Sequence, residues 1–239
     1  MLTLAITTTT RLAGISLHED SRLLGEIKIE VVKTHSGTII EQIDRLFSWT
    51  GKKLEDVKNV LVSVGPGSFT GVRIGISVVK GLFYGRDVDY YGINELEALA
   101  YQAFYILEKE FENKIEAREK KIYSLIDSGK EKIYMGIYKP EKGKLEREAE
   151  HEVIRLDSLI EKINSEEGKI IIIGDAGFNY KSKIVEKTDK KVEFLMDEMI
   201  KITTVSFMKM FSGKVAKKTD ALNLKPDYLE KSQAERDRK

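Results

Sequence analysis

The chain contains no cysteine, and its 239 residues include only three histidines, three prolines and one tryptophan. Without cysteine there is neither a disulfide framework nor a thiol nucleophile. His18, His35 and His151 do not lie at helical spacing from one another, so a metal site built on paired histidines is not expected. Because the sequence also has no recognisable Ser-His-Asp motif, these absences argue against a peptidase.

Net charge and long apolar runs are lacking as well. The 40 Lys and Arg residues nearly balance the 39 Asp and Glu residues, leaving a formal charge of +1, whereas a protein that holds RNA through its overall field is much more basic. No segment approaches the roughly 20 apolar residues that span a bilayer. The start, MLTLAITTTT, has no basic region of a signal peptide. We therefore expect a cytoplasmic protein in which any RNA contact is local or made through a partner.

The first half of the chain shows three short strand patterns followed by alternating helices and strands. The predicted elements are strands at 2–6, 13–18 and 23–30, a helix at 36–50, a strand at 60–64, a helix at 70–84, a strand at 88–93 and a helix at 95–111. This order is typical of a ribonuclease-H-like α/β unit.

The second half partly repeats that order after the charged stretch at 108–121. Its predicted elements are strands at 122–127, 132–139 and 145–154, a helix at 157–164, a strand at 169–173 and a helix at 178–187. Two such halves predict an α/β fold of the two-lobed actin-like type, as in sugar kinases. We expect a first lobe at 1–108, a second lobe at 109–210, and a C-terminal segment with a charged tail at 211–239.

Actin-like kinases bind nucleotide with three loops, and here two of the three are degenerate, whereas the third, Gly174–Gly177 after a strand, is the best preserved. Thr7-Thr8-Thr9-Thr10 stands where an Asp would hold the metal; its hydroxyls could bond a phosphate but cannot replace an anionic metal ligand. The turn Asp127–Lys130 keeps one carboxylate and one glycine, which is also the composition of an ordinary hairpin. The residues of this candidate remnant nucleotide site are Thr7, Thr8, Asp127, Gly129, Gly174 and Asp175.

The segment GPGSFTG lies where a buried strand turns into a helix. Backbone amides at such a junction can bind an anion. However, a P-loop needs Lys where this chain has Val72, and a dinucleotide fingerprint would need its third glycine one residue earlier. A tight turn capped by Ser68 or Thr70 is therefore the favoured interpretation, with anion binding as the alternative.

Two predicted helices, 36–50 and 70–84, carry more apolar surface than one core needs, which is typical of a protein interface. In the second helix, a pair of glycines would let a neighbouring backbone approach closely. A basic residue in its first turn opposes the helix dipole and hints at a carboxylate on a partner. The candidate partner-binding residues on these helices are Ile39, Ile43, Leu46, Phe47, Gly71, Arg73, Gly75, Val78 and Leu82.

The run GPGSFTGVRIGISVVKGL resembles the signature of the TsaB (YeaZ) family. Five further segments fit in register: LAITTTT, the pair His35-Ser36, GINELEALA, SLIDSGKEKIYMGIY and KPDYLEKSQAE. The chain departs from the family pattern at Thr7, where relatives usually carry Asp, and at Gly37, where they carry an acid after His-Ser.

The resemblance implies the actin-like fold and a place in the threonylcarbamoylation of the tRNA adenosine beside the anticodon. It implies a non-catalytic subunit without cofactor or metal, which binds the catalytic paralogue TsaD through the first two helices and adds His35 to the partner-binding residues. It further implies a TsaE-like ATPase as partner, a homodimer when the chain is alone, and only indirect contact with tRNA. The main rival hypothesis is an actin-like phosphotransferase with an atypical nucleotide site.

Overall fold

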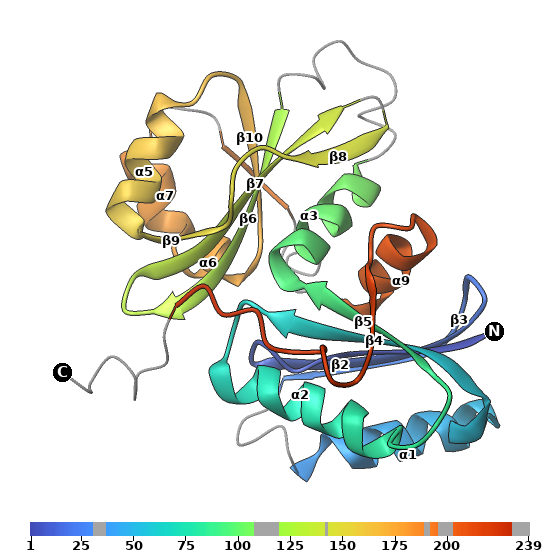
Figure 1. Ribbon diagram of the computed structural model, residues 1–239. Coiled ribbons are helices and arrows are strands. Elements are labelled where there is room, and N and C mark those ends of the chain that lie inside the picture. Colours follow the sequence, from blue (N-terminus) through green and yellow to red (C-terminus); the bar gives the residue numbers. More distant parts are fainter. Residues whose placement is uncertain (31–36, 108–119, 142, 189–191, 196–202, 231–239) are drawn as a thin grey trace. The chain divides into compact units, whose positions relative to one another are not determined.

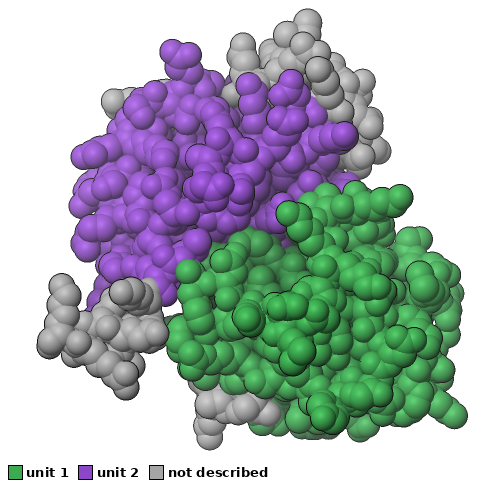
Figure 2. All heavy atoms as spheres, in the orientation of Figure 1, with its two compact units in different colours: residues 1–95, 203–228 green, residues 96–202, 229–239 purple. Residues whose placement is uncertain are grey.

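The computed structural model describes residues 1–30, 37–107, 120–141, 143–188, 192–195 and 203–230 (Figure 1). The chain forms two compact units, coloured separately in Figure 2. Unit 1 comprises residues 1–95 and 203–228, and unit 2 comprises residues 96–202 and 229–239. Within the described ranges, no helix is both long and apolar enough to cross a membrane.

Unit 1 is built on a six-stranded mixed sheet in the order β12-β5-β4-β1-β2-β3. Its strands are β1 (Leu2–Thr7), β2 (Leu12–Glu19), β3 (Arg22–Glu30), β4 (Val57–Gly65), β5 (Asp89–Asn94) and β12 (Lys218–Thr219). The neighbours β1, β4 and β5 run parallel, whereas β2, β3 and β12 pair antiparallel. Three antiparallel strands at one edge and parallel strands towards the other are the predicted ribonuclease-H-like arrangement.

Helices cover both faces of this sheet (Figure 1). One face carries α1 (Ile39–Thr50) and α2 (Phe69–Leu82), and the other carries α9 (Thr204–Ser212). A short 3-10 turn, η2 (Leu54–Asp56), precedes β4. Because neither face of the central strands meets water, β1 is buried along its whole length.

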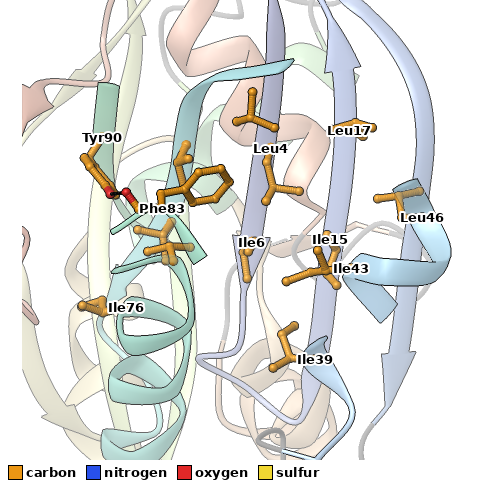
Figure 3. Packing of buried hydrophobic residues seen from close by; sticks show 14 of the residues in the cluster. Leu4, Ile6, Ile15, Leu17, Ile39, Ile43, Leu46, Ile76, Phe83 and Tyr90 are labelled. Carbon is orange, nitrogen blue, oxygen red and sulfur yellow. Dashed lines mark hydrogen bonds between the residues drawn. The ribbon is translucent and has the colours of Figure 1, made fainter. Parts of the chain in front are cut away.

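The core of unit 1 lies between the sheet and helices α1 and α2 (Figure 3). Leu4 and Leu17 are direct cross-strand partners, as are Ile6 and Ile15, so alternate positions of β1 and β2 project onto one face. The helical and further strand residues that Figure 3 labels in this cluster are Ile39, Ile43, Leu46, Ile76, Phe83 and Tyr90. These interdigitating aliphatic side chains fix the positions of α1 and α2 on the sheet.

Unit 2 repeats the same sheet. Its strands are β6 (Lys120–Gly129), β7 (Lys132–Glu141), β8 (Lys144–Arg147), β9 (Glu152–Arg155), β10 (Lys169–Ile173) and β11 (Val192–Phe194). The order β11-β10-β6-β7-β8 matches β5-β4-β1-β2-β3 of unit 1, with parallel pairs at the corresponding places. Its helices are α3 (Glu95–Ile106, whose first residue belongs to unit 1), α5 (Leu156–Ser165), α6 (Asp175–Asn179) and α7 (Lys181–Lys187). This duplication confirms the predicted actin-like α/β fold.

Two boundaries differ from the sequence-based expectation because distant segments decide them. The predicted strand at 145–154 is two strands, β8 and β9, which both pair with β7. The expected lobes ran from 1 to 108 and from 109 to 210, whereas the compact units change at Glu95 and residues 203–228 return to unit 1. That return follows from packing, since α9 lies on β1 and β2 and β12 extends the sheet beside β5.

Candidate functional site

The turn after β1 uses all of its threonine hydroxyls within unit 1. Thr7, Thr8 and Thr9 are buried. Thr7 Oγ1 donates to the carboxylate of Glu95, at 3.1 Å from Oε1 and 3.3 Å from Oε2, and lies 3.1 Å from Thr9 Oγ1. Thr8 Oγ1 donates to the carbonyl oxygen of Gly71 at 2.7 Å. The hydroxyls that could have bound a phosphate are therefore engaged with this unit's own groups.

The GPGSFTG segment closes over that turn. Ser68 N donates to the carbonyl oxygen of Thr9 at 2.6 Å. A Cβ atom on Gly67 would lie 2.4 Å from the Thr9 carbonyl oxygen, and one on Gly71 would lie 2.0 Å from that of Thr8. Only glycine lets the two backbones approach this closely. The loop therefore packs directly against the backbone of the turn and leaves no space for a side chain at Gly67 or Gly71.

Ser68 caps the helix that begins in this segment. Its hydroxyl oxygen accepts a hydrogen bond from Gly71 N at 3.2 Å, and Ser68 O accepts one from Val72 N at 2.9 Å. Of the two interpretations of GPGSFTG, the capped turn with Ser68 as the cap is confirmed. The first-turn amide of Gly71 is satisfied by the protein itself.

Glu95 decides the electrostatics of the closed turn. Its side chain is fully buried at the start of α3, directly beside Thr7. A phosphate brought to this turn would meet a carboxylate in place of a metal ion, and it would have to displace the Thr7–Glu95 hydrogen bonds. Like charges at such separation in a desolvated place repel strongly. The arrangement in unit 1 opposes phosphate binding.

The corresponding turn of unit 2 brings together the other four residues of the candidate remnant site, Asp127, Gly129, Gly174 and Asp175. Asp127 N donates to Asp175 Oδ1 at 2.8 Å, and Gly129 N donates to Asp127 Oδ1 at 2.7 Å. Asn179 Nδ2 and Tyr180 Oη donate to the Asp127 carboxylate at 2.8 and 3.1 Å. Asp127 is therefore bound within its own unit by donors from α6 and its end.

Gly174 and Asp175 form the junction between β10 and α6. Gly174 has φ of +109°, and a Cβ atom there would lie 2.0 Å from the carbonyl oxygen of Leu125. The pKa of Asp175 is raised from 3.8 to about 6, chiefly by burial; the hydrogen bond from the backbone amide of Asp127 opposes this shift, and the charge of Asp127 adds to it. Within the described residues, no group of three or more His, Asp or Glu side chains is placed to hold a metal ion.

The partner-binding prediction needs correction for six residues. The side chains of Ile39, Ile43, Leu46 and Phe47 are buried in the core of unit 1 rather than presented on α1. A Cβ atom on Gly75 would lie 2.7 Å from Thr8 Oγ1, so this glycine, like Gly71, serves packing inside the unit. Helical periodicity alone could not tell a face turned to the sheet from one turned to a partner.

What α1 and α2 do present is a different set of side chains. Ile40 and Trp49 of α1 are 55% and 70% exposed, and Tyr84, after α2, is 89% exposed. Along α2, Ile74, Val78 and Leu82 are partly buried against the core and partly open, and Arg73 is exposed. We call Ile74, Val78 and Leu82 the α2 ridge. His35 lies outside the described residues.

A family model described as TsaD, tRNA N6-adenosine threonylcarbamoyltransferase, matches residues 25–236. The tRNA threonylcarbamoyladenosine biosynthesis protein TsaB of Bacillus subtilis is 24% identical over 237 residues, which cover 98% of this chain and 96% of that protein. The chain belongs to the TsaB (YeaZ) family. TsaB of Escherichia coli is 31% identical over 104 residues, covering 44% of this chain and 45% of that protein.

A solved structure agrees with this membership at the level of the fold. YeaZ from Pseudomonas aeruginosa superposes with a TM-score of 0.72 at 20% identity, covering 95% of this chain and 99% of that one. The segment GPGSFTG, which carries the resemblance to this family, is the loop that closes the Thr7–Thr9 turn in this chain. Sequence reasoning missed Glu95, Phe69 and Tyr228 as parts of this region. For Phe69 the i, i+4 spacing to Arg73 was an available signal.

Proposed function

We propose that this chain is a non-catalytic subunit in the threonylcarbamoylation of the tRNA adenosine next to the anticodon, and that it acts by binding a TsaD-like catalytic paralogue. The pathway comes from its relatives, which are named tRNA threonylcarbamoyladenosine biosynthesis proteins. The observation that carries the non-catalytic role is the closed turn of unit 1, where Thr7 is bound to the buried Glu95 carboxylate and Gly67 and Gly71 lie against the Thr turn.

The same observation disfavours the rival phosphotransferase. A kinase of this fold needs an anionic ligand for magnesium and an open phosphate turn in its first unit. Among the described residues, the Thr7 hydroxyl donates to an internal carboxylate and lies beside the Thr9 hydroxyl, and a side chain on Gly67 or Gly71 would meet the backbone of the turn. The carboxylate of Asp127 in unit 2 is likewise bound by Asn179 and Tyr180.

The α2 ridge supports partner binding. Residues 74, 78 and 82 follow the i, i+4, i+8 row that forms one ridge of a helix, and the neighbouring exposed Gly81 adds no side chain that would hinder a second helix. We propose that the ridge docks on the TsaD-like subunit and, when that subunit is absent, on a second copy of this chain. A TsaE-like ATPase completes the assembly, and tRNA is contacted through the complex.

Reconstitution tests this proposal. The purified chain is combined with the TsaD-like and TsaE-like proteins of the same organism, with tRNA, ATP and an activated threonylcarbamoyl donor, and threonylcarbamoyladenosine formed on tRNA is measured by mass spectrometry. We expect modification only when the chain is present, and neither ATP hydrolysis nor tRNA modification by the chain alone. Val78→Asp should abolish modification and binding of the TsaD-like subunit, because it places an unpaired charge in an apolar contact.

A matched control is Val185→Asp, which changes a valine of unit 2 that is already 57% exposed and should leave modification unchanged. The rival is tested in parallel by calorimetric titration of the isolated chain with magnesium and ATP. Micromolar binding together with turnover that Asp127→Ala abolishes would replace the scaffold proposal with the phosphotransferase.

A further inference from the structure

Two aromatic rings hold Arg73 at the start of α2. The guanidinium carbon lies 3.9 Å from the centre of the Phe69 ring and 5.9 Å from that of Tyr228. The two rings stack on each other, with centres 4.5 Å apart and planes 19° from parallel. Arg73 Nε donates to Tyr228 Oη at 2.8 Å. We call Phe69, Arg73 and Tyr228 the arginine clamp.

The C-terminal segment sets the position of Tyr228. Asp227 N donates to the carbonyl oxygen of Val64 at 2.8 Å, which attaches this segment to the end of β4. Asn94 Nδ2, at the end of β5, donates to Asp227 Oδ2 at 3.1 Å. The tyrosine ring is thereby anchored to the rigid sheet of unit 1, although it comes from a residue 155 positions away from Arg73.

The clamp leaves the outer part of the guanidinium unused. Arg73 is exposed, and among the described residues its two terminal nitrogens have no hydrogen-bond partner. Stacking and the Nε bond already restrict the side chain, so little conformational entropy is left to lose when a ligand binds. Two parallel N–H donors held in one plane match a carboxylate, which accepts both at once.

We propose that the arginine clamp binds a carboxylate on the protein partner of this chain and fixes the direction in which α2 docks. This proposal rests on the proposed function and names a second contact of the same partner. By helical periodicity, Arg73 lies about 140° around α2 from Val78, so the clamp extends the contact beyond the α2 ridge to the helix's other flank.

Composition favours a protein carboxylate over an RNA phosphate. The flank of α2 that contains Arg73 also carries Ser77 and Lys80, with Tyr84 just after the helix, so it offers one further cation and one further aromatic ring. RNA surfaces of proteins collect many cations along the phosphate backbone. Arginine and tyrosine with only one further cation nearby are instead typical of the energetic centres of protein interfaces.

Binding of the separately purified TsaD-like subunit of the same organism tests the proposal. We expect Arg73→Ala to weaken binding by about 30-fold or more, as for an interface hot spot. Arg73→Lys should recover only part of this loss, because an ammonium group lacks the planar fork. Arg147→Ala is the matched control: it removes an exposed arginine of unit 2 that pairs with Glu150, and it should leave binding unchanged.

Tyr228 is a positioning residue in this scheme, and a double-mutant cycle separates that role from a structural one. Tyr228→Phe keeps the ring but removes the acceptor of the Arg73 Nε bond. We expect roughly 5-fold weaker binding in the Arg73 background and no effect in the Arg73→Ala background. A purely structural tyrosine would cost the same in both backgrounds. Thermal melts of each variant identify any loss that comes from unfolding.

The outcomes discriminate between this proposal and the one on which it rests. If the unmodified chain does not bind the TsaD-like subunit, both are overturned. If it binds and Arg73→Ala binds equally well, the clamp proposal alone is overturned. If the isolated chain binds tRNA and Arg73→Ala removes that binding while the subunit still binds, the ligand is a phosphate and the carboxylate assignment is overturned.

Discussion

The turns after β1 and β6 hold equivalent places in two sheets of the same topology, yet their chemistry differs. In unit 1 the turn is buried, neutral in its own side chains, and bound to a carboxylate that comes from the start of α3. In unit 2 the turn reaches the surface and carries its own carboxylate, Asp127, bound by donors from α6 and Tyr180. In each unit the polar side chain of the turn has a hydrogen-bond partner from the same unit. In unit 1 the turn residue Thr7 donates, whereas in unit 2 the turn residue Asp127 accepts.

What the two turns share is closure by a glycine. A Cβ atom on Gly71 would lie 2.0 Å from the Thr8 carbonyl oxygen, and one on Gly174 would lie 2.0 Å from that of Leu125. In both units a helix that follows a parallel strand is pressed against the first hairpin. The two units therefore share this backbone contact and differ in the polar side chains around it.

The largest effect should come from adding a methyl group at these two contacts. Gly71→Ala and Gly174→Ala should each lower the free energy of unfolding by about 3 kcal/mol or more, because the Cβ atom meets a backbone carbonyl that cannot rotate away. Gly174→Ala also forces alanine to φ of +109°. Urea unfolding measures both.

Gly81→Ala is the matched control for these substitutions. A Cβ atom there meets nothing within 4 Å, so this variant should be stabilised by about 0.5–1 kcal/mol through helix propensity. Wild-type stability for Gly71→Ala or Gly174→Ala would show that the two closures are not the rigid contacts described above.

A second prediction concerns a variant in which the turn of unit 1 carries a carboxylate, as the turn of unit 2 does. Thr7→Asp should destabilise unit 1 by about 2–3 kcal/mol at neutral pH, because it places a second carboxylate beside buried Glu95. Thr7→Asn has the same shape without the charge and should cost less. Hydrogen exchange of β1 amides would localise the loss to unit 1.

Adding Glu95→Gln to the Thr7→Asp variant tests the cause. If repulsion between the two carboxylates is responsible, the double variant recovers most of the lost stability. Equal stability of the single and double variants would contradict the electrostatic account and leave shape as the cause.

A third prediction uses the raised pKa of Asp175 in unit 2. Since the folded-state value of about 6 exceeds the ordinary 3.8, the folded protein binds more protons than the unfolded chain between those values. The contribution of this group to stability is therefore fully present below about pH 4 and is lost as pH rises through 6. We expect a loss of about 1–2 kcal/mol.

Asp175→Asn should remove that pH dependence while keeping an acceptor for Asp127 N. Free energies of unfolding measured between pH 4 and pH 7 for wild type and variant give the difference directly. Parallel curves for the two proteins would show that Asp175 titrates normally in the folded state.

The smallest effect concerns the caps of the two helices. Ser68 caps α2 with its hydroxyl, whereas Gly174 at the start of α6 has no side chain to do so. Ser68→Ala should cost about 1 kcal/mol, and Ser68→Thr should cost less because threonine also caps. Thermal melts detect this difference, and an unchanged Ser68→Ala variant would show that the cap contributes no net stability to the helix.

Several features of the candidate site were accessible from the sequence. GPGSFTG was recognised as a strand–helix turn, Ser68 as one of two caps, and Thr7 as the place of a missing carboxylate. The prediction of partner-binding residues on α1 was wrong for an apolar stripe whose side chains are buried against the sheet, namely Ile39, Ile43, Leu46 and Phe47. An apolar stripe indicates that a helix face is buried, but it does not indicate whether the surface that buries it belongs to the same chain or to another one.

By itself the sequence determined the local elements, the internal duplication and the family, because periodicity, turn residues and a specific motif are all read within short stretches. Tertiary structure alone decided which groups meet. Glu95 reaches Thr7 across 88 positions, and Tyr228 reaches Arg73 across 155. The tertiary structure also decided that Gly71 and Gly75 pack against Thr8 inside unit 1. Such contacts depend on how sheets and helices pack in three dimensions, and no pattern along the chain encodes that distance.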